Sequence, residues 1–181
     1  ADMLSRFLPY MILILCLQGA MYPAMDLTAG EKERQTLETL LVNPVSRLNI
    51  VLGKYLAVST MAFGSTIFTL LGQFVFFHFF ADSITDGKVQ LSLDPFILGV
   101  SLLVLLPAVM FFSTLLILIS TWARSMKEAQ SYLGPLTMLV IFPSMASMIP
   151  GLELNLSYAL IPIFNVALIV REVLMSNFDQ A

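Results

Sequence analysis

Long apolar blocks alternate with short charged segments along this chain. A helix needs about 20 residues to cross roughly 30 Å of hydrocarbon, and four of the blocks reach about that length. The second block is longer than a single crossing requires. These blocks lie at about residues 7–25, 46–80, 95–122 and 131–149. The pattern predicts an all-α fold, a polytopic transmembrane helical bundle with four spans.

The most strongly charged segment lies between the first two blocks, and we expect Pro23 and Asp26 to end the first block. Thr28 and Glu31 have the spacing of a capping box, and Asn43-Pro44 ends the run, so we expect an amphipathic helix over about residues 29–43. Its leucines share one side at about 100° per residue, and Glu33 falls within that apolar sector. A carboxylate there favours a protein partner over lipid alone.

The link between the third and fourth blocks is short and charged. Ser125 and Glu128 repeat the capping-box spacing at the start of the fourth helix. Inside the blocks, Pro107 and Pro143 predict kinks, because an interior proline leaves a backbone carbonyl unpaired. We therefore expect two kinked spans joined on one side of the membrane.

The C-terminal segment over about residues 158–175 is apolar, but Pro162 and Asn165 interrupt it and Arg171-Glu172 follows. A full span would have to bury the Asn165 amide and end within a few residues of an ion pair. We expect an interfacial or re-entrant segment on the outer side instead.

Composition supports a membrane protein surrounded by a lipid bilayer. Hydrophobic residues make up 58% of the chain, charged residues 12%, and the mean hydropathy is +0.88. Soluble domains have roughly 45–50% apolar and about 25% charged residues. The net charge of -3 leaves no broad basic surface, which argues against a nucleic-acid partner.

The placement of positive charge orients the bundle. If the amphipathic helix faces the cytoplasm, six basic residues lie inside and three outside, as the positive-inside rule requires. The inner residues are Lys32, Arg34, Arg47, Lys54, Arg124 and Lys127, and the outer ones are Arg6, Lys88 and Arg171. The first span then runs inward and the second outward.

Motifs for chemistry within the chain are missing. The sequence has no H-E-x-x-H, no G-x-S-x-G and no Asp, Glu and His cluster at ligand spacing, so we expect no catalytic residue and no metal site. Gly53-Lys54 lacks the upstream glycine and the following Ser or Thr of a phosphate loop. Cys16 and His78, each the sole residue of its type, are expected to be a packing residue and part of an interfacial aromatic belt.

The charged segment resembles the cytoplasmic loop of type-2 ABC exporter permeases, most closely the NatB-like sodium-efflux group. The resemblance rests on Asp26, on Gly30 to Leu41, on Pro44 to Arg47 with Gly53-Lys54, on Ala123 to Tyr132, and on Ile161-Pro162 with Asn165. It implies a six-span permease, of which residues 1–181 would be a single partial transmembrane domain. The missing parts would be the first span with its large outer domain and the final span.

The resemblance also assigns roles to residues. A coupling helix would contact a separate ABC ATPase subunit through Gly30, Glu31, Lys32, Glu33, Arg34, Thr36, Leu37, Glu38, Leu40 and Leu41. A second cytoplasmic contact would comprise Arg124, Ser125, Lys127 and Glu128. Pro162 and Asn165 would lie in the family's outer re-entrant segment.

The partners follow from the same resemblance. ATP and Mg²⁺ would be bound by the ATPase subunit, so this chain itself would carry no cofactor and would not be an enzyme. A second permease copy or a homologous half would complete the export path, in the plasma (inner) membrane of a prokaryote. Sodium is the substrate that the resemblance suggests.

Two other functions remain open from the sequence. One is a membrane domain associated with an intramembrane protease, which would require catalytic residues outside this chain. The other is an ATP-independent membrane scaffold or channel. An ATPase subunit that co-purifies with the chain would discriminate transport from both.

Overall fold

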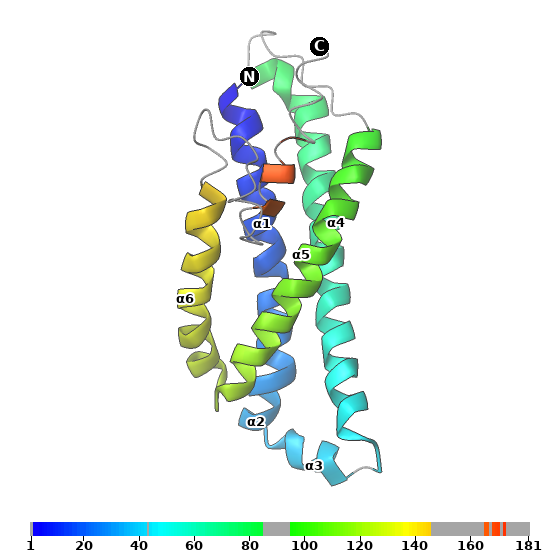
Figure 1. Ribbon diagram of the computed structural model, residues 1–181, viewed down its shortest axis with the longest axis vertical. Helices are drawn as coiled ribbons and strands as arrows, with labels where there is room; N and C mark the ends of the chain where they lie inside the picture. Colours follow the sequence, from blue (N-terminus) through cyan, green and yellow to red (C-terminus); the bar gives the residue numbers. More distant parts are fainter. Residues whose placement is uncertain are drawn as a thin grey trace. The chain divides into compact units, whose positions relative to one another are not determined.

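The computed structural model describes residues 2–42, 44–84 and 95–145, together with residues 165–166, 168–170 and 172. These residues are almost entirely helical, and none of them forms a strand (Figure 1). The elements are α1 (Asp2–Met25), the π-helical segment η1 (Asp26–Gly30), α2 (Glu31–Glu33), α3 (Thr36–Val42), α4 (Arg47–Ile84), α5 (Pro95–Trp122) and α6 (Met126–Met145). The expected all-α fold class is confirmed for the described residues.

Three helical stretches are long and apolar enough to cross a membrane, and they lie at Tyr10–Glu33, Arg47–Phe76 and Leu98–Trp122. They correspond to the first three expected spans. The fourth expected span, about residues 131–149, falls on α6, which is not among these stretches, and on residues 146–149, which lie outside the described residues. Four spans therefore stays a prediction.

The expected outer re-entrant segment lies mostly outside the described residues, and Pro162 is among those not described. Asn165 is helical and half-buried, as is its neighbour Val166. A re-entrant course for residues 158–175 therefore stays a prediction.

The expected end of the first block near Met25 coincides with the end of α1, but the chain does not leave helical geometry at Pro23 or Asp26. Helix α1 continues through Pro23 to Met25, and helical geometry persists through η1 and α2 as far as Glu33. A proline inside a long helix removes one hydrogen bond and tends to bend the helix, and it does not need to end it. The chain leaves the helix only at Gln35, whose φ of 59° is left-handed.

The chain divides into two compact units. One unit, called the loop unit below, consists of residues 16–65 and 109–139. It contains the second part of α1, all of η1, α2 and α3, the first part of α4, the end of α5 and most of α6. Every basic residue whose side chain is described belongs to the loop unit.

The core of the loop unit is made of small and aliphatic side chains with one aromatic ring. Phe112 and Leu116 of α5 are almost fully buried, as are Leu17 of α1 and Leu133 of α6. Alanines fill the narrower positions: Ala20, Ala24, Ala62, Ala123 and Ala129. Small residues allow helix backbones to approach closely, which is the usual basis of helix packing in membranes.

Gly19 marks such a close approach between α1 and α4. A Cβ atom added at Gly19 would overlap the side chain of Ser65, whereas one added at Gly64 would meet nothing within 4 Å. We expect Gly19→Ala to destabilise the protein by about 1–3 kcal/mol through overpacking. Gly64→Ala is the matched control and should leave thermal stability in detergent unchanged or slightly raised. Equal effects of the two substitutions would contradict the close approach.

The other unit contains the described residues of 1–15, 66–108 and 140–181. Its buried side chains include Ile12 and Leu13 of α1, Leu105 of α5 and Val140 of α6. The buried hydroxyl of Ser144 donates to the carbonyl of Val140 at 2.7 Å, so this polar group is satisfied within its own helix.

Candidate functional site

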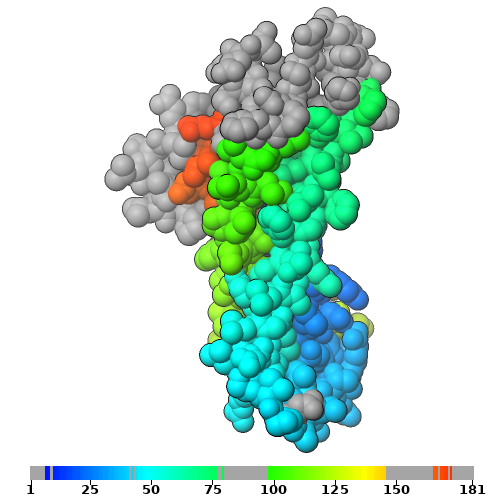
Figure 2. Space-filling model, turned by 90° about the vertical axis from the view of Figure 1, so that its right-hand side faces the viewer, coloured from blue at the N-terminus to red at the C-terminus, as the bar shows by residue number. Residues whose placement is uncertain are grey.

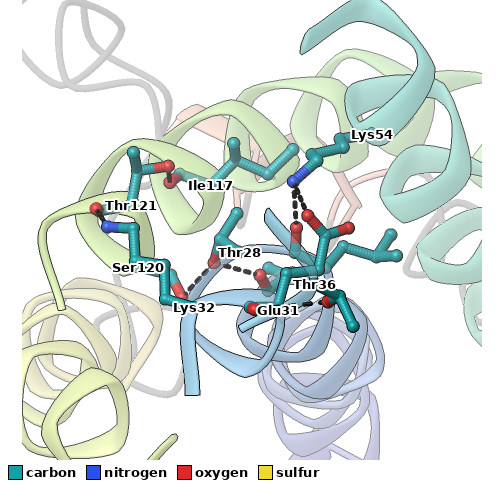
Figure 3. Close-up of polar contacts among 10 residues, drawn as sticks. Thr28, Glu31, Lys32, Thr36, Lys54, Ile117, Ser120 and Thr121 are labelled. Carbon is teal, nitrogen blue, oxygen red and sulfur yellow. Dashed lines mark hydrogen bonds and ion pairs between the residues drawn. The ribbon is translucent and has the colours of Figure 1, made fainter. Parts of the chain in front are cut away.

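Lys32 joins the loop after α1 to the end of α5. Its ammonium group donates a hydrogen bond to the backbone carbonyl of Thr121 (Figure 3). It donates a second one to the backbone carbonyl of Ala123 at 3.2 Å. Helix α5 ends at Trp122, so these carbonyls belong to the end that has no intrahelical donors and carries partial negative charge. A lysine is therefore matched to this position in both hydrogen bonding and charge.

Glu33 makes the complementary contact with the start of α6. Its carboxylate accepts a hydrogen bond from the backbone N–H of Met126 at 2.7 Å. Met126 is the first residue of α6, where free N–H groups and the helix dipole favour a negative charge. Lys32 and Glu33, called the helix clamp below, thus hold both sides of the short link between α5 and α6.

A pair of buried hydroxyl groups reinforces the clamp from inside the unit. The hydroxyls of Thr28 in η1 and Ser120 in α5 are 2.6 Å apart, and the Thr28 hydroxyl also lies 2.6 Å from the carbonyl of Ala24 (Figure 3). Thr28 is therefore not the helix N-cap that its spacing with Glu31 predicts. It lies inside a continuous helix and connects that helix to α5.

Removing the Thr28 hydroxyl should measurably weaken the unit. We expect Thr28→Val to lower the free energy of unfolding by about 1–3 kcal/mol, because Ser120 is left buried without this partner. Thr114→Val on the exposed side of α5 removes a hydroxyl bonded only within its own helix and should cost less. Thermal unfolding in detergent compares the two, and a smaller loss for Thr28→Val than for Thr114→Val would contradict the role of the pair.

Two ion pairs involve further charged residues of the loop between α1 and α4. Lys54 of α4 pairs with Glu31 and donates to the carbonyl of Leu27 at 2.6 Å (Figure 3). Arg34 pairs with Asp26 at 2.7 Å, with 61% of its side chain exposed. Exposed ion pairs contribute roughly 0–1 kcal/mol to stability. The half-buried pair between Lys54 and Glu31 is therefore expected to stabilise the loop more than the exposed pair between Arg34 and Asp26.

The single amphipathic helix expected over about residues 29–43 is wrong. Two short helices occupy this range, and Gln35 separates them with its left-handed backbone. An α-helical hydrogen bond runs from Arg34 N–H to the Gly30 carbonyl at 3.0 Å, and a turn bond from Gln35 N–H to the Lys32 carbonyl at 3.1 Å closes the first helix. The side chains of Lys32 and Glu33 bind the ends of α5 and α6, and the chain turns after Glu33 before α3 begins.

Gly30 lies where the loop meets the start of α6. It is buried, and a Cβ atom there would lie 3.2 Å from Asp26 Oδ1 and 3.3 Å from Met126 Sδ. Both distances are tighter than ordinary packing, so the Asp26 and Met126 side chains would have to shift by a few tenths of an ångström to make room for a Cβ atom. Gly30 thus serves packing within the unit.

Helix α3 and the start of α4 present an exposed apolar surface. Val42 is 85% exposed and Leu48 is 68% exposed, and Val45 lies between them in sequence. Glu38 and Thr39 of α3 are exposed as well. We call these five residues the α3 surface; Figure 2 shows the segments that carry them, in blue to cyan, on one outer face of the loop unit.

The remaining predicted loop residues contribute less to this surface. Thr36 is exposed, and its hydroxyl donates to the Glu31 carbonyl at 3.2 Å. Leu37 and Leu40 are half-buried, and the side chain of Leu41 lies outside the described residues. Contiguous exposed apolar residues mark a protein or membrane contact, and in this loop such residues belong to the α3 surface.

The link between α5 and α6 has its own caps. The Ser125 hydroxyl accepts from Glu128 N–H at 3.2 Å, as the capping-box spacing predicts, while the Glu128 carboxylate accepts from Arg124 N–H at 2.7 Å. The Tyr132 hydroxyl, the Arg124 N–H and nearby positive charges lower the pKa of Glu128, so this cap stays charged at neutral pH. Arg124 and Lys127 remain exposed.

The structure thus brings together the two loop segments that the sequence marked separately. The contacts that join them involve Thr28, Ser120 and Met126, which the sequence did not single out as parts of one site. Among the described residues, no group of three or more His, Cys, Asp and Glu side chains could hold a metal ion.

Comparison with known proteins gives two matches. Residues 2–178 match the family described as ABC-2 family transporter protein. The chain is also similar to the ABC transporter permease protein NatB of Bacillus subtilis, with 36% identity over 184 residues, which covers 100% of this chain and 47% of the relative. The chain therefore spans about half the length of the curated relative it matches. No solved structure matches it.

Proposed function

Since this chain belongs to the ABC-2 family of transporter proteins, we propose that it forms part of the membrane-spanning permease subunit of an ATP-driven ABC exporter. Family membership confirms the resemblance that the loop sequence carries. Three helical stretches that are long and apolar enough to cross a membrane support a membrane location. ATP and Mg²⁺ would be bound and hydrolysed by a separate ATPase subunit.

The observation that carries the proposal is the helix clamp. The loop between α1 and α4 is bound to the end of α5 through Lys32 and to the start of α6 through Glu33. A partner that displaces this loop would therefore displace those helix ends with it. Rigid movement of packed helices is a common way for a nucleotide-driven change to reach a distant part of a protein.

The α3 surface is the place where such a partner would dock. Its apolar centre, Val42 and Leu48, is exposed, while the charged residues Glu31 to Arg34 already have partners within the chain. We therefore assign docking of the ATPase subunit to α3 and the start of α4, and transmission of its movement to the helix clamp. Exposed Arg124 and Lys127 supply the second cytoplasmic contact of the proposal.

Purification of the full-length protein from its native membrane tests the proposal. We expect a polypeptide with a phosphate loop to co-purify, and its ATPase activity to change on reconstitution with the permease. Transport activity that persists in the absence of any ATPase subunit would overturn the proposal.

The proposal extends to the assembly and the substrate. A second permease copy or a homologous half would complete the export path in the plasma membrane of a prokaryote, a location consistent with the bacterial relative. The loop sequence suggests sodium as the substrate. ATP-dependent movement of radioactive sodium into inverted membrane vesicles tests this part, and vesicles that move no sodium while hydrolysing ATP with the assembled permease would exclude it.

A further inference from the structure

A cavity of about 260 Å³ opens among η1, α2, α3, α4 and α5 in the loop unit. Three of its lining residues are basic, namely Lys32, Arg47 and Lys54, and none of the described residues that line it is acidic. Most of the remaining wall is aliphatic: Leu37, Ile50, Val51 and Ile117. The cavity therefore combines an apolar wall with positive charge.

The cavity lies where three membrane-crossing stretches end. These stretches end or begin at Glu33, Arg47 and Trp122, and each of these positions is in the lining or adjacent to a lining residue. Basic residues at such ends sit at the boundary between hydrocarbon and lipid headgroups. The first turns of α4 also expose apolar side chains that do not line the cavity, among them Leu48 and Leu52.

The three cations differ in what they already bind. Lys32 is bound to neutral carbonyl groups, and Lys54 is paired with Glu31 (Figure 3). Arg47 is exposed, and within the described part of the chain its guanidinium has no hydrogen-bond or ion-pair partner. With Glu31 counted against the three cations, the site keeps a net positive charge.

We propose that this cavity binds an anionic phospholipid of the cytoplasmic leaflet. The planar guanidinium of Arg47 would bind the phosphate through paired hydrogen bonds, a geometry to which arginine is suited. The aliphatic wall would cover the part of an acyl chain that lies next to the headgroup. A soluble anion has no acyl chain and would not use this wall. Basic pockets between membrane helices on the cytoplasmic side bind anionic headgroups in this way. The proposal requires that the loop unit faces the cytoplasm, and it does not require the ATPase subunit.

Lipid retention by the purified full-length protein tests the site. The protein is placed in nanodiscs of phosphatidylcholine with a minor fraction of phosphatidylglycerol, and the lipids retained after extraction into mild detergent are counted by native mass spectrometry. We expect phosphatidylglycerol to be retained preferentially. Arg47→Gln should reduce that preference about fivefold, the factor for the about 1 kcal/mol that one basic residue contributes near an anionic surface.

Arg124→Gln is the matched control, because Arg124 is also exposed on this side of the protein but does not line the cavity. It should leave the preference unchanged. An equal loss in both variants, or no loss in Arg47→Gln, would overturn the proposal. Displacement of phosphatidylglycerol by millimolar inorganic phosphate would also overturn it, since that result would identify a site for soluble anions.

Discussion

Reversing the charge of Lys32 is expected to uncouple ATP hydrolysis from transport. In Lys32→Glu the ammonium that binds the α5 carbonyls is replaced by a carboxylate that these carbonyls repel. Changing attraction to repulsion at a helix end alters the contact by about 2 kcal/mol, which shifts a two-state population by roughly thirtyfold. We expect ATP-dependent transport in reconstituted vesicles to fall by about tenfold or more.

Two further variants separate the clamp from a general effect of charge. Arg34→Glu reverses a neighbouring charge whose only described contact is the exposed pair with Asp26, so it should reduce transport by less than about twofold. The exchange Lys32→Glu with Glu33→Lys should not restore transport, because the backbone groups that the clamp binds cannot be exchanged. Restored transport in the double variant would show that the two residues act on each other and not on α5 and α6.

A charge in the α3 surface is expected to detach the ATPase subunit. Val42 is 85% exposed and would be covered on docking, so Val42→Asp would bury an unpaired carboxylate at a cost of about 2–5 kcal/mol. We expect the amount of ATPase subunit that co-purifies to fall by about thirtyfold or more. The fold should be retained, because the Val42 side chain packs little against this chain.

Gln130→Glu is the control for this variant. Gln130 is exposed on α6, so the substitution adds one negative charge to the loop unit outside the α3 surface. Co-purification at the level of the unmodified protein is expected. If Val42→Asp retains the ATPase subunit as well as Gln130→Glu does, docking at the α3 surface is excluded.

The long helices could be predicted from the sequence because hydropathy and helix-ending residues are local signals. The third expected span, about residues 95–122, has the bounds of α5, and the second, about residues 46–80, differs from α4 (Arg47–Ile84) by a few residues at its end. The cap at Ser125 was also readable, since its partner Glu128 is three positions away. Each of these features depends on residues within a turn or two of one another.

The construction of the site could not be predicted, because its contacts join residues far apart in sequence. Thr28 and Ser120 are 92 positions apart, and Glu33 and Met126 are 93 apart. The periodicity of polar and apolar residues over about residues 29–43 predicted that Glu31 to Glu33 lie on one amphipathic helix, with charged side chains facing solvent or a partner. In the structure Lys32 and Glu33 bind the ends of α5 and α6, whereas Glu31 pairs with Lys54 of α4.

The central claim is that the clamp joins the loop and the α5–α6 link into one body that the ATPase subunit moves. Spin labels at Arg34 and Gln130, both exposed in the loop unit and outside the α3 surface, report the distance across this body by pulsed electron paramagnetic resonance. Cys16 is buried, so the labels would go to the introduced cysteines.

The account predicts one narrow distance distribution, the same in the nucleotide-free and ATP-trapped transporter, and a clearly broader one in Lys32→Glu. A distance that shifts by several Å on ATP trapping, or a Lys32→Glu distribution as narrow as that of the unmodified protein, would contradict it.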